Sequence, residues 1–115
     1  MRMIRFKRSF LPLILEGRKT QTRRIEGRYR PGEIYRVNRT EVWILITRKY
    51  QQRLGEISLE EARKEGFSSP EEFRQAWIKI FGSWNPDLQV WAYEFRLISP
   101  RYLQSVYTVS ERGWR

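Results

Sequence analysis

The chain contains neither cysteine nor histidine, and this absence restricts its possible folds more than any other sequence feature. Without thiols it cannot form a disulfide framework, and without thiolate or imidazole ligands it cannot form the usual structural zinc site. The chain must therefore fold around a hydrophobic core. Its 115 residues predict a single domain. Hydrophobic residues make up 40% of the chain and include five Trp, which is enough to build that core.

The same absence excludes whole classes of enzyme mechanism. Catalysis by Ser-His-Asp or Cys-His groups is impossible, so acid–base chemistry would have to use Lys, Glu, Asp, Tyr or a hydroxyl group. We expect no protein-bound metal and no cofactor. No apolar run approaches the roughly 20 residues of a membrane helix, and the first residues lack the apolar stretch of a secretory signal. We therefore expect a cytoplasmic protein that does not act at membranes.

The formal net charge of +10 is concentrated in the first half of the chain. Residues 1–53 carry 15 basic and 4 acidic side chains, a net charge of +11, whereas residues 54–97 carry 5 basic and 8 acidic side chains, a net charge of −3. Most of the basic residues are arginine, whose planar guanidinium suits phosphate groups and base edges. This pattern favours a nucleic acid or a nucleotide as partner. A solvated basic face that only aids solubility is the alternative.

Local signals predict the order strand, helix, three strands, two helices and strand. Expected strands cover 3–6, 18–25, 33–39, 41–49 and 90–97, and the first helix runs from about Ser9 to Gly17. The run Ser58-Leu59-Glu60-Glu61 is a capping box that begins a helix ending at Gly66, and Ser69-Pro70 begins another that ends at Gly82. This order lacks a regular βαβ alternation, so we expect an α+β domain with a small curved sheet or barrel flanked by helices.

Two apolar stripes identify the expected core. In the last helix and the last strand, the residues that should face inward are Phe73, Ala76, Trp77 and Ile80, followed by Trp91, Tyr93, Phe95 and Leu97.

The segment Gly17-Arg18-Lys19-Thr20-Gln21-Thr22-Arg23-Arg24 is the strongest candidate for a ligand site. Four cations within eight residues repel one another unless an anion or carboxylates offset them. On a strand, Thr20, Thr22 and Arg24 would share one face, and Gln21, Arg23 and Ile25 the other. Exposed strand residues alternating with core residues would be the purely structural explanation. Only Ile25 is plainly apolar, however, so the pattern favours a ligand site.

This segment, together with Phe10 and Ile14-Leu15-Glu16 before it, resembles the signature of ASCH domains, which adopt a PUA-like β-barrel. Three further stretches are similar to the same family: Arg30-Pro31-Gly32-Glu33-Ile34-Tyr35-Arg36-Val37, Lys64-Glu65-Gly66-Phe67 and Val90-Trp91-Ala92-Tyr93-Glu94-Phe95. The resemblance covers roughly residues 3–98. It implies an ASCH, PUA-like domain over residues 1–98, with residues 99–115 as a basic, aromatic C-terminal extension of the same domain.

The resemblance implies two kinds of function. PUA-like domains commonly bind RNA, and one ASCH branch hydrolyses N4-acetylcytidine to cytidine and acetate with a Lys, a Thr and a Glu. The matching positions here are Lys19, Thr22 and Glu65. Arg24, Thr20 and Arg23 would then contact the substrate.

The chemistry of these residues allows two schemes for amide hydrolysis. The Thr22 hydroxyl can attack if Lys19 is held neutral and accepts its proton, or Glu65 can activate a water while Lys19 stabilises the oxyanion. The sequence leaves both open. A metal-independent N4-acetylcytidine amidohydrolase is the leading hypothesis, a non-catalytic RNA-binding module is its rival, and a ribonuclease acting through Lys and Tyr is a weaker third.

The aromatic side chains of the tail allow two interpretations. Tyr102, Tyr107 and Trp114 alternate with arginines and could stack on RNA bases. Packing of the tail against the domain is the alternative.

Overall fold

The computed structural model describes residues 2–98, so the predicted extension 99–115 and its aromatic side chains lie outside the described residues. The elements in chain order are β1 (Met3–Ile4), a 3-10 turn (Arg8–Phe10), α1 (Leu11–Leu15), β2 (Gln21–Arg24), β3 (Ile34–Val37), β4 (Trp43–Arg53), a second 3-10 turn (Leu54–Glu56), α2 (Leu59–Lys64), α3 (Pro70–Phe81) and β5 (Gln89–Ile98). The predicted order of helices and strands is confirmed.

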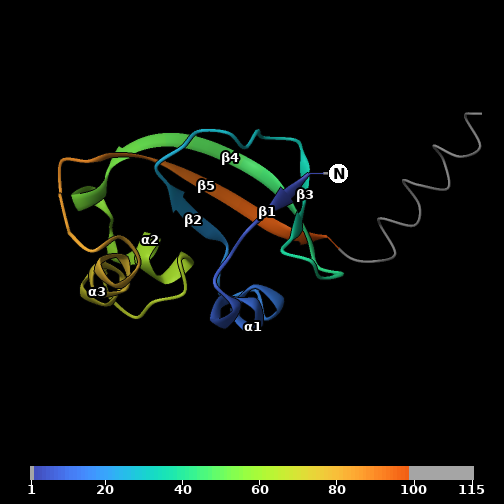
Figure 1. Cartoon of the computed structure of the whole chain (residues 1–115), viewed down its shortest axis with the longest axis horizontal. Coiled ribbons are helices and arrows are strands. Elements are labelled where there is room, and N and C mark those ends of the chain that lie inside the picture. The colour runs from blue at the N-terminus through green and yellow to red at the C-terminus, as the bar shows by residue number, and fades with distance from the viewer. Residues whose placement is uncertain (1, 99–115) are drawn as a thin grey trace, which may run out of the picture.

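The strands form one five-stranded sheet in the order β1-β3-β4-β5-β2. β1 pairs with β3 in parallel, and the other neighbours are antiparallel. The long β4–β5 pair curves, and α1, α2 and α3 lie on its concave side (Figure 1). The predicted α+β class with a curved sheet and flanking helices is therefore confirmed, and the sheet is open, with β1 and β2 at its edges.

Local capping explains where the helices begin and end. Ser58 Oγ accepts a hydrogen bond from the Glu61 amide at 3.0 Å, and Ser69 Oγ accepts one from the Glu72 amide at 3.2 Å. After α3, Gly82 has a φ of +86°, the left-handed conformation that glycine adopts without strain. These capping contacts confirm the predicted starts of α2 and α3 and the predicted end of α3.

The strand predicted over 18–25 is shorter than expected. The amides of Arg18 and Lys19 both donate to the Leu13 carbonyl, at 2.9 and 3.0 Å, so these two residues still complete the end of the first helix. Pairing with β5 begins only at Gln21. Lys19 consequently belongs to a helix-terminal turn that precedes the strand.

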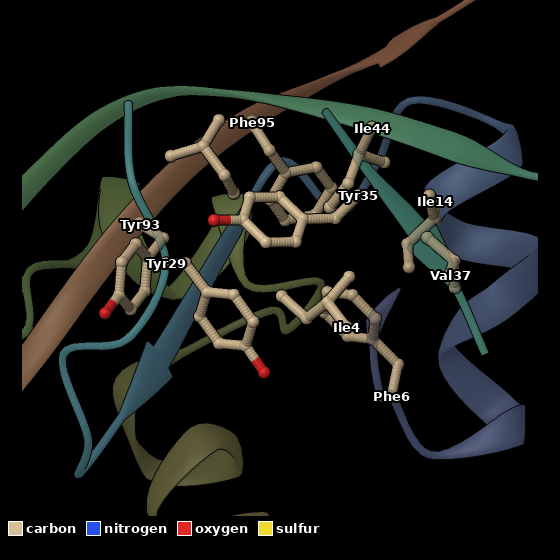
Figure 2. Packing of buried hydrophobic residues seen from close by; sticks show 10 residues of the cluster. Ile4, Phe6, Ile14, Tyr29, Tyr35, Val37, Ile44, Tyr93 and Phe95 are labelled. Atoms are coloured by element: carbon tan, nitrogen blue, oxygen red, sulfur yellow. The ribbon is translucent and has the colours of Figure 1, made fainter. Parts of the chain in front are cut away.

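Buried side chains form two hydrophobic clusters. The larger one joins β1, α1 and the faces of β3, β4 and β5, and consists of Ile4, Phe6, Ile14, Tyr29, Tyr35, Val37, Ile44, Ile46, Tyr93 and Phe95 (Figure 2). The smaller one lies around α2 and α3 and consists of Leu54, Ile57, Ala62, Phe73, Trp77 and Val90. β5 therefore contributes to both clusters.

Two expected core residues are exposed. Ile80 is 53% exposed because it lies near the end of α3, one turn beyond the buried Trp77. Leu97 is 41% exposed and its neighbour Ile98 is buried, so the apolar face predicted for β5 does not continue to the end of the strand. Val90 and Ala92, on the opposite face, are also buried, so β5 is covered on both faces in its first half. Within residues 2–98, no helix is both long and apolar enough to span a bilayer.

Candidate active site

The turn between α1 and β2 places Lys19 against the end of α2. Gly17 ends the first helix with a φ of +74°, and the Thr20 amide then donates to the Lys64 carbonyl at 2.7 Å. On the other side of Thr20, its carbonyl accepts from the Phe95 amide at 2.9 Å. The backbone of this turn is thus hydrogen-bonded both to α2 and to the sheet, which holds the Lys19 side chain in one position.

Lys19 and Glu65, predicted to share a site, are in direct contact and are both buried. The Lys19 ammonium donates to Glu65 Oε1 at 3.0 Å and to the Glu65 backbone carbonyl at 2.8 Å. Glu65 is the C-cap of α2, so Lys19 also satisfies a carbonyl that the helix end leaves without an intrahelical donor. The ammonium lies 4.4 Å from the centroid of the Phe10 ring.

Arg23 contacts the other oxygen of the same carboxylate. Its Nη1 donates to Glu65 Oε2 at 3.0 Å and to Gln21 Oε1 at 2.6 Å. Its Nη2 donates to Glu61 Oε2 at 2.7 Å, while Nε and Nη2 both donate to Gln52 Oε1, at 3.0 and 2.8 Å. These five hydrogen bonds use all five N–H groups of the guanidinium. Arg23 therefore holds Glu65 and Glu61 in place, and its predicted contact with substrate stays a prediction.

Glu61 and Tyr50 extend this network away from Lys19. Burial by itself opposes ionisation of Glu61, but hydrogen bonds from Tyr50, Ser58 and Gln52 together with Arg23 outweigh it and lower the pKa of Glu61 to about 2. Burial and the bond to Glu61 raise the pKa of Tyr50 to about 12. Near neutral pH the carboxylate is therefore charged and the phenol protonated, and the hydrogen bond between them supports the side of the network that faces away from Lys19.

Thr22 and Arg24 lie on the other face of β2, as the predicted alternation required. Thr22 is 5% exposed, and its Oγ1 accepts a hydrogen bond from Arg24 Nε at 3.0 Å. Arg24 Nη2 donates to the Arg5 carbonyl at 2.7 Å, and its guanidinium lies 4.9 Å from the centroid of the Phe6 ring. The hydroxyl is therefore held by a cation, which favours any negative charge that develops on its oxygen.

These side chains meet in a cavity of about 310 Å³, here called the Lys19 pocket. Five of the six predicted site residues line it, namely Lys19, Thr22, Arg23, Arg24 and Glu65, and Thr20 does not. The rest of its wall is mainly aromatic, with Phe6, Phe10, Phe67, Phe73, Trp77 and Phe81. Arg5 and Lys7, both exposed, also line it.

Sequence reasoning missed most of this aromatic wall, because its residues come from segments far apart in the chain. Phe10 is part of the motif around Lys19 and was the one available signal, whereas Trp77 was interpreted only as core. The structure confirms that Trp77 is buried and also places it on the pocket wall. One side chain can therefore support the core and shape the site.

Burial lowers the pKa of Lys19 below its ordinary value of 10.5, and the attraction of Glu65 opposes that shift. A lowered pKa means that the amine loses its proton at a lower pH, and a general base must be in this neutral form to accept a proton. Among residues 2–98, no three acidic side chains come close enough together to form a metal-binding cluster.

Comparison with known proteins identifies the fold. No protein-family model and no curated protein matches the sequence. Among solved structures, an ASCH domain from Lactobacillus crispatus JV V101 has a TM-score of 0.68 at 18% identity, covering 75% of this chain and 68% of that one.

Two further solved structures agree. The hypothetical protein PH0355 has a TM-score of 0.67 at 18% identity, covering 82% of this chain and 95% of that one. A point mutant of ZmASCH from Zymomonas mobilis has a TM-score of 0.58 at 15% identity, covering 90% of this chain and 78% of that one. At these identities the likeness concerns the fold, and the protein has the fold of ASCH domains.

Proposed function

We propose that the protein hydrolyses the N4-acyl amide of cytidine derivatives and releases cytidine and acetate from N4-acetylcytidine. One observation carries this proposal: Lys19, Thr22 and Glu65, the positions that match the catalytic residues of the amidohydrolase branch, line one aromatic-walled cavity. Its volume of about 310 Å³ is at the lower end for small-molecule sites. Flat aromatic walls suit a pyrimidine ring, which stacks on such side chains.

The hydrogen bonds of Glu65 favour Thr22 over a water molecule as the nucleophile. Each carboxylate oxygen of Glu65 already accepts from a buried cation, one from Lys19 and the other from Arg23. Neither oxygen of this carboxylate is therefore free of a cation, which leaves it poorly placed to bind and orient a water molecule. Thr22 Oγ1, in contrast, accepts one bond from Arg24, which leaves its own proton free to be removed.

In the first half of the proposed reaction Thr22 Oγ1 attacks the acetyl carbonyl carbon. Its proton passes to the neutral amine of Lys19, and a C–O bond forms while negative charge collects on the carbonyl oxygen. The C–N4 bond then breaks and Lys19 gives the proton to N4, so that cytidine leaves and acetyl-Thr22 remains. Arg24 stabilises the threonine oxygen while it carries negative charge.

In the second half water attacks acetyl-Thr22, with Lys19 again accepting a proton. The ester C–O bond breaks, and Lys19 returns the proton to the Thr22 oxygen, which restores the hydroxyl. Acetic acid leaves and loses its remaining proton to solvent as acetate. While Lys19 is neutral, Glu65 still has a cation as partner, because Arg23 Nη1 lies 3.0 Å from its Oε2. We therefore assign Glu65 and Arg23 the role of positioning Lys19 throughout the cycle.

The second candidate is a non-catalytic RNA-binding module. It is supported by the exposed cations Arg5 and Lys7 beside the pocket and by the likeness to ASCH domains, a fold class that the sequence resemblance links to RNA. A ribonuclease that uses Lys and Tyr has weaker support. The Tyr50 hydroxyl is bonded to Glu61, and within residues 2–98 no tyrosine lines the Lys19 pocket.

The test is incubation of the EDTA-treated protein with N4-acetylcytidine, with cytidine release followed by chromatography. We expect release by wild type, retained activity in Thr22→Ser, which keeps a hydroxyl, and a loss of about 100-fold or more in Thr22→Val. Lys19→Ala should be inactive, whereas Lys79→Ala, at an exposed site outside the pocket, should match wild type.

Appreciable turnover by Lys19→Ala would remove the assignment of this residue. A folded wild-type protein that ignores the nucleoside but binds an oligoribonucleotide, with affinity that falls steeply as salt rises, would favour the RNA-binding candidate.

A further inference from the structure

A second hollow shares lining residues with the Lys19 pocket and lies at the end of β2, beside the segment that follows this strand. This arginine groove encloses about 600 Å³, and Arg5, Arg24, Arg28 and Ile25 are among the residues that line it. Arg5 and Arg24, together with Phe81, line both hollows. A molecule whose base occupies the Lys19 pocket would therefore extend directly between these two arginines.

Arg24 is a half-buried cation with no carboxylate partner within the described part of the chain. Its hydrogen bonds go to two neutral acceptors, Thr22 Oγ1 and the Arg5 carbonyl. Burial lowers the pKa of Arg24 below its ordinary value of 12.5, yet a guanidinium stays charged near neutral pH. Partial burial of an unpaired charge is unfavourable, and an anion bound at the junction would offset it.

Two further arginines flank the same junction. Arg5 is exposed, and its side chain has no hydrogen bond or ion pair with any residue from 2 to 98. The one carboxylate lining the groove within those residues, Glu26, pairs with Arg28 at 2.8 Å, and both of these side chains are mostly exposed. The groove therefore presents more positive than negative charge, and its exposed ion pair can rearrange at little cost.

We propose that the arginine groove binds a phosphate group attached to the ribose of the acylated cytidine, with Arg5 and Arg24 as the principal ligands. Arginine binds phosphate through parallel charge-assisted hydrogen bonds, and two arginines at one junction favour that group over a neutral hydroxyl. The substrate is then a nucleotide, either free or within an RNA chain, in preference to the bare nucleoside. This inference rests on the proposed function, because it takes the Lys19 pocket as the site of the base.

The test compares kcat/KM for N4-acetylcytidine, its 5′- and 3′-monophosphates, and a short oligoribonucleotide with one N4-acetylcytidine. Wild type is measured beside Arg5→Gln and a matched control, Arg96→Gln, which removes the same charge from an exposed arginine lining neither hollow. We expect wild type to prefer at least one phosphorylated substrate by about tenfold or more. Arg5→Gln should lose most of that preference, measured as the ratio of kcat/KM for phosphorylated to unphosphorylated substrate, and Arg96→Gln should keep the wild-type ratio.

The phosphorylated substrates also distinguish the two sources of phosphate. A preference already complete with a monophosphate indicates a free nucleotide, and one seen only with the oligoribonucleotide indicates an RNA chain. Equal kcat/KM for all four substrates, or equal behaviour of Arg5→Gln and Arg96→Gln, would overturn the inference.

A binding measurement tests the arginine groove independently of the proposed reaction. If wild type hydrolyses none of the substrates, the proposed function fails, and calorimetric titration with cytidine and cytidine 5′-monophosphate still decides about the groove. Tighter binding of the monophosphate that depends on Arg5 supports it, and equal binding of the two ligands rejects it.

Discussion

Replacing Glu65 by glutamine tests the buried charge network directly. The carboxylate lies 3.0 Å from Lys19 Nζ and 3.0 Å from Arg23 Nη1, and the exposed fractions of the three side chains are between 0% and 4%. Removing one member of such a buried pair costs about 3–5 kcal/mol of the free energy of unfolding, because the remaining charges stay desolvated. Arg23 keeps its bond to Glu61, so we expect the lower end, about 3 kcal/mol.

The pH dependence of that loss gives a second, independent check. The pKa of Lys19 is lowered in the folded protein, so the unfolded chain binds more protons between that lowered pKa and 10.5. The unfavourable contribution of a charged Lys19 is present in full below the lowered pKa, and stability rises as pH increases from that pKa toward 10.5. Without Glu65 the pKa of Lys19 falls further. The destabilisation caused by Glu65→Gln should therefore become smaller as pH rises toward 10.5.

Urea unfolding followed by tryptophan fluorescence measures both effects. The matched control is Glu26→Gln, which removes a carboxylate from an exposed pair with Arg28 and should cost at most about 1 kcal/mol. Adding Lys19→Met to Glu65→Gln removes the cation left without its partner and should recover part of the loss. A Glu65→Gln protein as stable as the control, or one whose loss of stability does not shrink at any pH up to 10.5, would refute the assignment of a buried, mutually dependent pair.

Three further predictions concern neighbouring residues. The folded pKa of Glu61 is about 2, below its ordinary 4.5, so its interactions stabilise the protein above pH 4.5 and are lost as pH falls toward 2. In Glu61→Gln, the free energy of unfolding should therefore depend less steeply on pH in this range than in wild type. An unchanged slope would contradict the assignment. Ser58→Ala removes the N-cap of α2 and should cost about 1 kcal/mol in urea unfolding, a loss that Ser58→Asn would largely avoid. Gly66 has a φ of +100°, and a Cβ there would lie 3.0 Å from Leu13 Cδ1. Gly66→Ala should therefore strain the backbone and lower the free energy of unfolding by about 1–2 kcal/mol. A thermal denaturation midpoint equal to that of wild type would contradict this.

Much of the fold could be predicted from local signals. The capping serines and the left-handed Gly17 and Gly82 specify where helices begin and end through contacts within a few residues, and all four are confirmed. Local signals were less reliable near element ends. Leu97 continues the apolar alternation of β5, yet its exposure depends on which other segments cover that end of the strand.

The candidate site was only partly accessible to sequence reasoning. The motif around Lys19 and Thr22 is contiguous, so its residues were identified together. The role of Arg23 was not, because its acceptors Gln52, Glu61 and Glu65 lie 29 to 42 positions away. The short alternating strand predicted that Arg23 and Thr22 point to opposite faces, and the structure added that one face is a satisfied ionic network.

The amino-acid sequence by itself determined the α+β class, the order of the elements, the exclusion of thiol and imidazole chemistry, and the segment that carries the candidate site. These features depend on composition and on interactions between residues close in the chain. Only the tertiary structure decided that the sheet stays open, that Glu65 joins Lys19 to Arg23, and that the aromatic rings of α3 close the Lys19 pocket. Those features depend on contacts between distant segments, whose geometry is established only when the helices pack against the sheet.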